Sequence, residues 1–541
     1  MVADGQRASR DVELTTGIYK LDAFKVTGER EGNALALTMQ RNADNVKNVV
    51  AMDSFGNLPN MSVGEVVMRL PGVAPITQDE GLNFGVQIRG MPGNLNTVTM
   101  DGQRMPSIGT NRALELHTVS ATLYEQMEMV KGLTPDASAD SLGGNLNLKT
   151  RSTLNMKEKR RVNFSSMVRG APPFTEQIPL RAEHRYHPLF TVSYQEIFGV
   201  LGGDRNLGVQ ANVRYSENAI GGVIVNRNYQ ATTASPAPVW DYSVRNNFNN
   251  RIQKNANVKA EYRFSDSSKF TVNTLFNHNI ERMRRGYTMR AYTGSATAVP
   301  SATAVATGIN PGWSETLTTV RPLTTDNYLS STTNTTLVDV STTGPNSYIV
   351  RQWLGSFAGE HTSGPIKLEY NTGYSRNNLR TGMTTGGAKG GQYALTQRVA
   401  GIGWNLESPD GADFSRFTQT AGPDIANPSN YRPITNGLTA GPQNLDQYNR
   451  HFNADLIYTL PTTAPITFKT GFTWRELEIA SKNFSRRWSY LGTSALPTAT
   501  NIDLYGTLAE GKTMPVWQVS DFMTDRAPTN PALWSEDIYY N

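Results

Sequence analysis

Few residues in this 541-residue sequence combine a type and a spacing that could carry out chemistry. His184 and His187 could bind a metal ion or a haem iron, but a pair of imidazoles without a third ligand is a weak signal. The glycine-rich stretch 386–391 looks like a phosphate-binding loop, yet it lacks the GK[ST] ending and the strand-to-helix setting. No GxSxG motif lies in the setting that a hydrolase requires. We therefore expect no enzyme, no catalytic residues, no cofactor and no metal site.

The composition excludes further kinds of site. The sequence contains no cysteine, which removes disulfides, thiol nucleophiles and cysteine-based zinc sites. A net charge of +5 over this length gives no nucleic-acid footprint, so we expect no nucleic-acid partner. The sequence has no run of 18 apolar residues, which excludes a transmembrane helix. A spanning β-barrel stays possible, because its alternating strands average to a neutral hydropathy.

The elements that the sequence predicts after about residue 160 are β-strands. Apolar and polar residues alternate there, which is typical of strands with one apolar and one polar face. Nine segments show this alternation: 207–215, 256–264, 366–375, 451–458 and 466–475 clearly, and 162–169, 188–198, 269–281 and 348–360 more weakly. We therefore predict nine strands in this part of the chain.

The connections between these strands fall into two classes that alternate along the chain. Tight turns are expected near 199–205, 265–268, 361–365 and 461–465. Long tracts rich in Thr, Asn, Gly and Pro are expected near 217–250, 282–347, 377–448 and 481–541. In an antiparallel meander this order places every tight turn at one end, as in outer-membrane barrels with short periplasmic turns and long extracellular loops. Such a barrel directs its apolar side chains toward lipid and encloses a polar interior.

The first 155 residues contain a series of short motifs. Ser62 and Glu65 form a capping box that predicts a helix ending at Pro71-Gly72. Four further segments follow: VQIRG at 86–90, VTMDG at 98–102, MEMVKG at 127–132 and SLGGNLNLKT at 141–150.

In this order, the motifs resemble the plug of TonB-dependent outer-membrane transporters. The resemblance covers about 20–155 by motif and the rest of the chain by architecture only. It implies an α+β plug followed by an antiparallel transmembrane β-barrel, which has about 22 strands in this family. We therefore divide the chain into an N-terminal extension (1–30), a plug domain (31–155) and a partial β-barrel with long extracellular loops (156–541).

The resemblance also implies a function in the outer membrane. Receptors of this family take up a scarce nutrient, such as a ferric siderophore, a vitamin or an oligosaccharide, with energy transmitted by the periplasmic protein TonB. TonB grips an extended N-terminal segment by strand addition. The candidate TonB box comprises Leu21, Asp22, Ala23, Phe24, Lys25, Val26 and Thr27. The alternative is that this segment is an ordinary strand of the plug.

Further site residues follow from the same resemblance. Arg89 and Lys131 stand where the family places basic plug residues that pair with barrel carboxylates, although a lysine at 131 departs from the usual arginine. Plug loops on the extracellular side are expected to contact the ligand through Met91, Asn94, Asn96, Ser107, Thr110, Asn111 and Arg112. Aromatic residues of the long tracts could stack on a ligand, but most are expected to anchor loops: Trp240, Trp313, Tyr328 and Trp404.

Nine strands cannot close a membrane barrel, because an open sheet in lipid leaves two unpaired edges. We therefore expect the N-terminal part of a longer transporter, with a plug beside an open wall. Two alternatives remain. A passive or secretory barrel would lack the plug and the TonB box. A soluble secreted β-rich protein that binds or acts on carbohydrate would bury Ile366, Phe468 and Trp474 and expose Lys259 and Arg263 to solvent.

Overall fold

The structure is a computed structural model. It describes residues 32–488 except 56–61, 78–82, 108–113, 133, 135–140, 171–185, 231–234, 284–285, 294–307, 324–334, 344–345, 382–392, 409–414, 428–429, 441–442, 463–465 and 484–485. The candidate TonB box, His184 and the glycine-rich stretch 386–391 lie outside the described residues.

The N-terminal domain (residues 32–156) combines short helices with a mixed five-stranded sheet in the order β1-β6-β7-β4-β5. β4 and β7 are parallel, while the other pairs are antiparallel, and β2 and β3 form a separate hairpin. The elements are α1 (Gly32–Arg41), β1 (Lys47–Ala51), α2 (Val63–Val67), β2 (Val73–Thr77), β3 (Asn83–Ile88), β4 (Asn96–Met100), β5 (Gln103–Arg104), β6 (Gln126–Val130) and β7 (Gly144–Lys149), with single 3-10 turns at Met52–Phe55, Gly93–Leu95, Leu116–Thr118 and Ala121–Leu123.

The motifs of the sequence explain this local structure. Ser62 caps α2, and its side chain accepts a hydrogen bond from the backbone N–H of Glu65 at 3.4 Å. The turn after β4 places Asp101 and Gly102 in the left-handed region, with φ of 48° and 84°. The apolar residues of α2, β3, β4, β6 and β7 form one core, which also includes Leu275 and Leu354 from the large sheet. The domain is therefore packed directly against that sheet.

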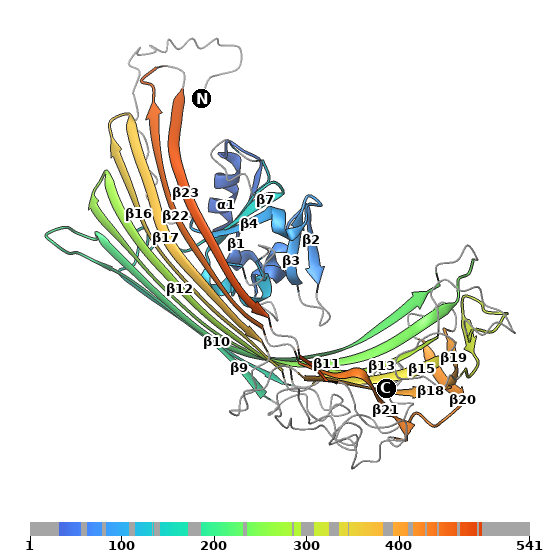
Figure 1. Cartoon of the computed structure of the whole chain (residues 1–541). Coiled ribbons are helices and arrows are strands. Elements are labelled where there is room, and N and C mark those ends of the chain that lie inside the picture. Colours follow the sequence, from blue (N-terminus) through green and yellow to red (C-terminus); the bar gives the residue numbers. More distant parts are fainter. Residues whose placement is uncertain are drawn as a thin grey trace, which may run out of the picture.

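Nine long antiparallel strands form a curved wall, as the alternation predicts. The wall has the order β8-β9-β10-β11-β12-β16-β17-β22-β23, and the N-terminal domain lies against its concave side (Figure 1). Among the described residues, no strand pairs with the outer side of β8 or of β23. The strands are β8 (Arg160–Gly170), β9 (Tyr186–Phe198), β10 (Leu207–Tyr229), β11 (Val239–Ser265), β12 (Ser268–Met283), β16 (Asn346–Ser363), β17 (Ile366–Thr381), β22 (Gln443–Thr459) and β23 (Thr467–Asn483).

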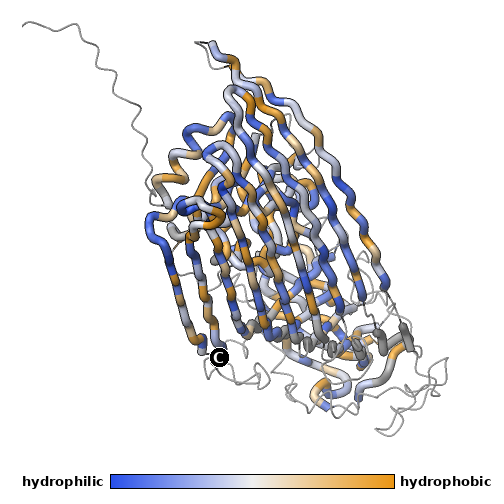
Figure 2. The backbone as a smooth tube through the Cα atoms, turned by 90° about the vertical axis from the view of Figure 1, so that its left-hand side faces the viewer, coloured by the Kyte–Doolittle hydropathy of each residue, from blue (hydrophilic) through white to orange (hydrophobic). Residues whose placement is uncertain are grey.

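The two faces of the wall differ in polarity, and Figure 2 shows apolar and polar residues alternating along its strands. Large apolar side chains on the face turned away from the N-terminal domain are exposed, for example Phe468 at 61% and Trp474 at 46%. The soluble alternative predicted that these two residues and Ile366 would be buried and that Lys259 would face solvent. Ile366 is 44% exposed, and Lys259 is only 7% exposed on the opposite face. That alternative is therefore wrong for the wall.

The prediction that the long tracts are loops needs correction. The tract 217–250 is largely strand, because β10 runs to Tyr229 and β11 starts at Val239. The far half of β11 then pairs with a second group of strands, which Figure 1 shows leading away from the N-terminal domain. This group, which we name the extension, contains β13 (Gly286–Thr293), β15 (Thr336–Thr343), β18 (Tyr393–Ala400), β21 (Arg432–Ala440) and β24 (Arg486–Trp488), and a separate small sheet of β14 (Leu317–Val320), β19 (Gly403–Glu407) and β20 (Arg416–Ala421).

The extension has its own apolar core, which explains why these tracts fold. Val338 and Val340 of β15 are buried together with Val399 of β18 and Trp404 of β19. The abundance of Thr, Asn and Gly hid these apolar positions in the sequence. In the part of the chain that the structure describes, no helix has the length and the apolar character needed to span a bilayer.

Candidate functional site

The face of the wall that contacts the N-terminal domain is lined with uncharged amide side chains. Asn212 donates to Asn257 at 3.3 Å, and Asn257 donates to Asn273 at 2.8 Å, so one amide chain crosses three strands. A second chain runs through Asn255, Asn277 and Gln352, at 2.9 and 3.2 Å. Buried polar groups require hydrogen-bond partners, and these amides supply them to one another and to the N-terminal domain. This part of the interface is consequently polar and uncharged.

Asp101 and Glu261 join the domain to the wall near the tight turns. The Asp101 carboxylate accepts hydrogen bonds from the backbone N–H of Thr150 at 3.0 Å and from the side chain of Asn273 at 2.7 Å. Glu261 of the wall accepts from the backbone N–H of Thr153 at 2.8 Å and from the hydroxyl of Ser152 at 2.9 Å. These bonds fix the segment through which the chain leaves the domain.

In the middle of the interface, the side chain of Gln103 lies over two glycines of the wall. Its Nε2 donates to the carbonyl oxygen of Gly355 at 3.3 Å. A Cβ atom on Gly373 would lie 2.4 Å from the same nitrogen, so only glycine permits this approach. The predicted ligand residue Ser107 is also buried here: it donates to Gln447 at 3.0 Å, and its carbonyl accepts from Asn377 at 2.6 Å.

A buried ionisable cluster closes the interface toward the long connections. Glu115 accepts hydrogen bonds from the hydroxyl of Tyr348 at 2.8 and 3.0 Å. His117 Nε2 lies 3.2 Å from Glu281 Oε1, which also accepts a contact from Arg251 Nε at 3.1 Å. Burial raises the pKa of Glu115 to about 8, and burial lowers the pKa of His117 although Glu281 opposes that shift. These two groups of the N-terminal domain are therefore neutral near pH 7.

The hydrogen bonds that the structure gives to the predicted basic pair, Arg89 and Lys131, lie within the N-terminal domain. Arg89 is exposed, and its Nη1 donates to the carbonyl oxygen of Lys131 at 2.7 Å. Lys131 Nζ donates to the carbonyl oxygen of Pro71. Their pairing with carboxylates of the barrel stays a prediction.

The predicted ligand residues between β3 and β4 have different roles. Met91 and Asn94 are exposed, whereas Asn96 is buried. Asn96 Nδ2 donates to the carbonyl oxygens of Val86, Met91 and Pro92 at 3.2 to 3.3 Å, so this side chain shapes the loop. Thr110, Asn111 and Arg112 lie outside the described residues, and ligand contact by this whole set stays a prediction.

The described aromatic residues pack in or against the core of the extension rather than mainly anchoring loops. Trp404 is fully buried, with its ring centroid 5.7 Å from that of Phe417, and Trp313 Nε1 donates to the carbonyl oxygen of Pro236 at 2.8 Å. Trp240 packs against the same core, while Tyr328 lies outside the described residues.

His187 is buried with its Nδ1 3.8 Å from Glu217 Oε2. Within the described ranges, no three His, Cys, Asp or Glu side chains group as a metal site would require.

Sequence reasoning missed the side chains that hold the interface together: Asp101, Gln103, Glu115, His117, Glu261 and Glu281. One signal was present. Asparagine and glutamine recur at alternate positions of several strands, for example at Asn255 and Asn257, and this pattern marks a buried polar face rather than a solvated one. The pairing of Glu115 with Tyr348 joins positions 233 residues apart, which no local pattern indicates.

The match to a protein family decides the identity of the N-terminal domain. Residues 40–145 match the family described as the TonB-dependent receptor plug domain. The N-terminal domain is a plug domain of the TonB-dependent receptor type. Receptors that contain this domain are outer-membrane transporters. We therefore call the N-terminal domain of this chain the plug.

Solved structures similar to the chain include two transporters and a siderophore receptor. The ferric citrate transporter FecA in its unliganded form has 11% identity over 83% of this chain and 76% of that chain, with a TM-score of 0.29. The siderophore receptor PiuA from Acinetobacter baumannii has 11% identity over 83% of this chain and 62% of that chain, with a TM-score of 0.30. The copper transporter OprC has 11% identity over 83% and 63%, with a TM-score of 0.33. The chain therefore spans less than two thirds of the latter two proteins. No curated protein matches it.

Proposed function

We propose that this receptor takes up a scarce nutrient across the outer membrane, using energy transmitted by TonB. The nutrient belongs to the solutes that such receptors carry: a ferric siderophore, a vitamin or an oligosaccharide. The observation that carries the proposal is the polarity of the wall. Its apolar face is exposed, whereas its amide face is buried against the plug, as expected for a lipid-facing barrel with a plugged interior.

Within this proposal the chain divides into an N-terminal segment that binds TonB (1–30), the plug (31–155) and a partial barrel with long extracellular connections (156–541). The tight turns face the periplasm. The strands that form the extension, β13 to β24 outside the wall, face outward together with the long connections. α1 lies on the side of the plug nearer the tight turns in Figure 1, so the described part of the plug begins at the proposed periplasmic end.

An outer membrane holds neither an ion gradient nor ATP, so the energy for uptake must come from another compartment. TonB supplies this energy by pulling on residues 21–27. Strand addition binds TonB through backbone hydrogen bonds, with Phe24 and Val26 on one side of the segment and Lys25 and Thr27 on the other. On the outer side, Met91 and Asn94 contact the ligand directly, and Asn96 holds their loop in shape. Arg89 and Lys131 pair with barrel carboxylates and allow the plug to be released.

Uptake by cells that produce the full receptor tests this function. Replacing residues 21–27 by a Gly-Ser segment of equal length should leave ligand binding to whole cells intact and abolish energy-dependent uptake. Replacing residues 3–9 in the same way is the matched control and should leave both unchanged. Undiminished uptake after replacement of 21–27 would contradict the assignment of the TonB box, and uptake without TonB would contradict the proposed function.

A further inference from the structure

We infer that the outward face of the wall has a binding site for the phosphate group of an anionic membrane lipid, formed by Lys254, His278 and Arg351. We name these three residues the basic row. They belong to the neighbouring strands β11, β12 and β16. The inference rests on the membrane orientation of the proposed function and goes beyond it, because it assigns a lipid ligand to a surface outside the barrel interior.

The register of the strands brings the basic row together. Lys254 is directly opposite His278, and His278 is directly opposite Arg351. Because neighbouring strands lie about 4.8 Å apart, the three backbone positions span only about 10 Å. Both cationic side chains are close enough to His278 to interact with it electrostatically. Residues directly opposite on antiparallel strands also share a face of the sheet, so the three side chains form one patch.

The next residues on the same face show that this patch lies on the outward side. Phe276 and Trp353 are opposite each other, two residues from His278 and Arg351, and each is 43% exposed. Alternate residues of a strand share a face, so the basic row borders these aromatic side chains. Lys254 and Arg351 are themselves exposed. In the proposed orientation this is the face that meets lipid.

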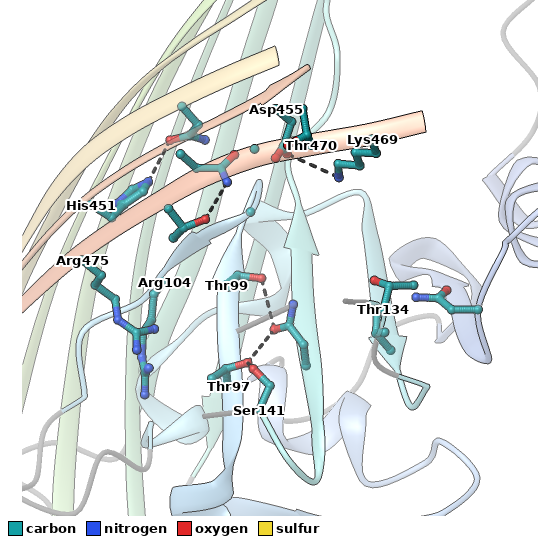
Figure 3. Close-up of a pocket in the computed structure, with 18 residues that line it drawn as sticks. Thr97, Thr99, Arg104, Thr134, Ser141, His451, Asp455, Lys469, Thr470 and Arg475 are labelled. Atoms are coloured by element: carbon teal, nitrogen blue, oxygen red, sulfur yellow. Dashed lines mark hydrogen bonds and ion pairs between the residues drawn. The ribbon is translucent and has the colours of Figure 1, made fainter. Parts of the chain in front are cut away.

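The basic row is separate from the space between the wall and the plug. A cavity of about 920 Å³ lies there, and none of the three residues lines it. Figure 3 shows plug residues such as Thr99 on one side of this cavity and wall residues such as His451 on the other. A ligand of the basic row therefore lies outside the interior through which a solute would pass.

The distance of the basic row from the tight turns places it at the boundary of the apolar band. His278 is ten residues beyond Ser268, the first residue of β12. At a rise of about 3.4 Å per residue and a tilt of about 35–45°, ten residues climb about 24–28 Å. The apolar band of a membrane barrel is about 25 Å tall. The row is therefore expected at the level of the headgroups of the outer leaflet.

The charge of the basic row is not balanced within the described part of the chain. Neither Lys254 nor Arg351 forms an ion pair there, and the contact of Lys254 is with the ring of Tyr215, whose centre lies 5.9 Å from Nζ. His278 Nε2 is buried without a hydrogen-bond partner among the described residues. Two cations beside such a nitrogen favour binding of an anion that also accepts hydrogen bonds.

Other cations on the same face differ from the basic row because they have carboxylate partners. Arg376 lies 3.0 Å from Asp446, and Arg450 lies 2.9 Å from Glu476. These pairs lie on β17, β22 and β23, next to the strands that form the row. The excess positive charge is thus confined to β11, β12 and β16.

A lipid phosphate matches both parts of this surface. Lysine and arginine bind phosphate oxygens, and basic clusters beside a bilayer attract anionic lipids. With its phosphate on the basic row, such a lipid would lay its acyl chains on Phe276 and Trp353. A soluble phosphate would gain only the polar contacts, so the surface favours the lipid.

Native mass spectrometry of the purified full chain in detergent, titrated with dioleoyl phosphatidic acid near neutral pH, tests the site. Wild type should bind this lipid more tightly than dioleoyl phosphatidylcholine, whose choline group cancels the phosphate charge. Glycerol 3-phosphate, which carries the same phosphate without acyl chains, should not bind at the same concentrations. Lys254→Gln and Arg351→Gln should each weaken binding of phosphatidic acid about fivefold, the effect of removing one cation beside an anionic lipid.

Two cations with carboxylate partners provide matched controls. Lys269 lies 3.1 Å from Glu360 near a tight turn, and Arg376 lies beside Asp446. Lys269→Gln and Arg376→Gln should bind phosphatidic acid as wild type does. Lys254→Arg and Arg351→Lys keep the charge and should lose less than the glutamine variants. Circular dichroism should show the same strand content in all variants, and the charge-keeping variant replaces one that fails this check.

The results separate the lipid site from the transport function. Equal binding of phosphatidic acid and phosphatidylcholine by wild type, or equal losses in the row and control variants, overturns the site. Binding of glycerol 3-phosphate as tightly as phosphatidic acid overturns the assignment to a lipid. If uptake still depends on residues 21–27 in these cases, the proposed function stands and only the site is lost. If phosphatidic acid binds as expected while uptake is independent of TonB, the proposed function fails and the lipid site remains.

Discussion

Glu115→Gln should remove a loss of stability that the receptor undergoes as the pH rises above neutrality. The carboxyl group is buried between the plug and the wall, where Tyr348, Glu281, Arg251 and His117 face it. Burial raises its pKa from 4.5 to about 8, so the folded receptor holds a proton that the unfolded chain releases at lower pH. The resulting stabilisation is complete below pH 4.5 and is lost as the pH rises toward 8.

His117 contributes a pH dependence of the opposite sign. Burial lowers its pKa below the ordinary 6.5, so its stabilisation is present above pH 6.5 and is lost as the pH falls through the lowered value. Between pH 4.5 and 6.5 the two effects oppose each other. Above pH 6.5 only the effect of Glu115 remains, and about 1.5 pH units at roughly 1.4 kcal/mol each give a loss of about 2 kcal/mol by pH 8.

Guanidinium unfolding of the folded receptor in detergent micelles, at several pH values from 6.5 to 8, measures this loss. Wild type should lose about 2 kcal/mol over the range, and Glu115→Gln should lose almost none, because a neutral amide replaces the protonated acid. Glu158→Gln is the control, since Glu158 is exposed and pairs with Arg161 at 2.7 Å, and it should behave as wild type does. A wild-type stability that is constant from pH 6.5 to 8, or an equal loss in Glu115→Gln, would refute the reasoning.

Three further substitutions test other parts of the structure. Gly373→Val should weaken docking of the plug by about 1–3 kcal/mol, because the added side chain meets Gln103 of the plug and His451 of the wall. Protease sensitivity of the plug should rise, and adding Gln103→Ala should restore resistance in part, because only the contact with His451 then remains. No change in sensitivity would contradict the close approach. Asn96→Ala should lower the stability of the loop between β3 and β4 by about 1–3 kcal/mol, because the side chain loses its hydrogen bonds to three carbonyl oxygens. Hydrogen exchange in this loop should become faster. Exchange at the wild-type rate would show that the side chain does not hold the loop. Trp404→Ala should lower the stability of the extension, but not of the wall, by about 3–5 kcal/mol, because it removes a large buried side chain. Hydrogen exchange in the strands of the extension should become faster. Equal exchange in wild type and variant would argue against a packed core.

The sequence was sufficient to predict the wall because alternation of polarity is a local signal. All nine predicted segments became strands, since each residue pair such as Phe472 and Thr473 directs neighbouring side chains to opposite faces. The plug motifs were equally local: the turn at Asp101-Gly102 requires positive φ, and Ser62 caps a helix. These features depend on few neighbours, so they can be read without knowing the fold.

The extension and the interface could not be predicted in the same way. β13, β15 and β18 are short, and their apolar residues gain a core only when segments far apart in the sequence come together, as Val338 and Val399 do with Val244. Hydrogen bonds such as the one between Ser107 and Gln447 join distant parts of the chain and depend on how the plug is seated. Composition alone therefore favoured loops where the structure has strands.

The orientation of the wall in a membrane is the central claim, and two adjacent residues of β23 test it most directly. The natural chain has no cysteine, so Phe472→Cys and Thr473→Cys each give a single site for a spin label. Phe472 is on the exposed apolar face, and Thr473 lines the cavity beside the plug. For receptor reconstituted in phospholipid vesicles, relaxation of the label at 472 should respond mainly to oxygen, which concentrates in lipid, and the label at 473 mainly to a water-soluble nickel chelate. Equal access of the nickel chelate to both labels, or the reverse pattern, would contradict a wall whose apolar face meets lipid.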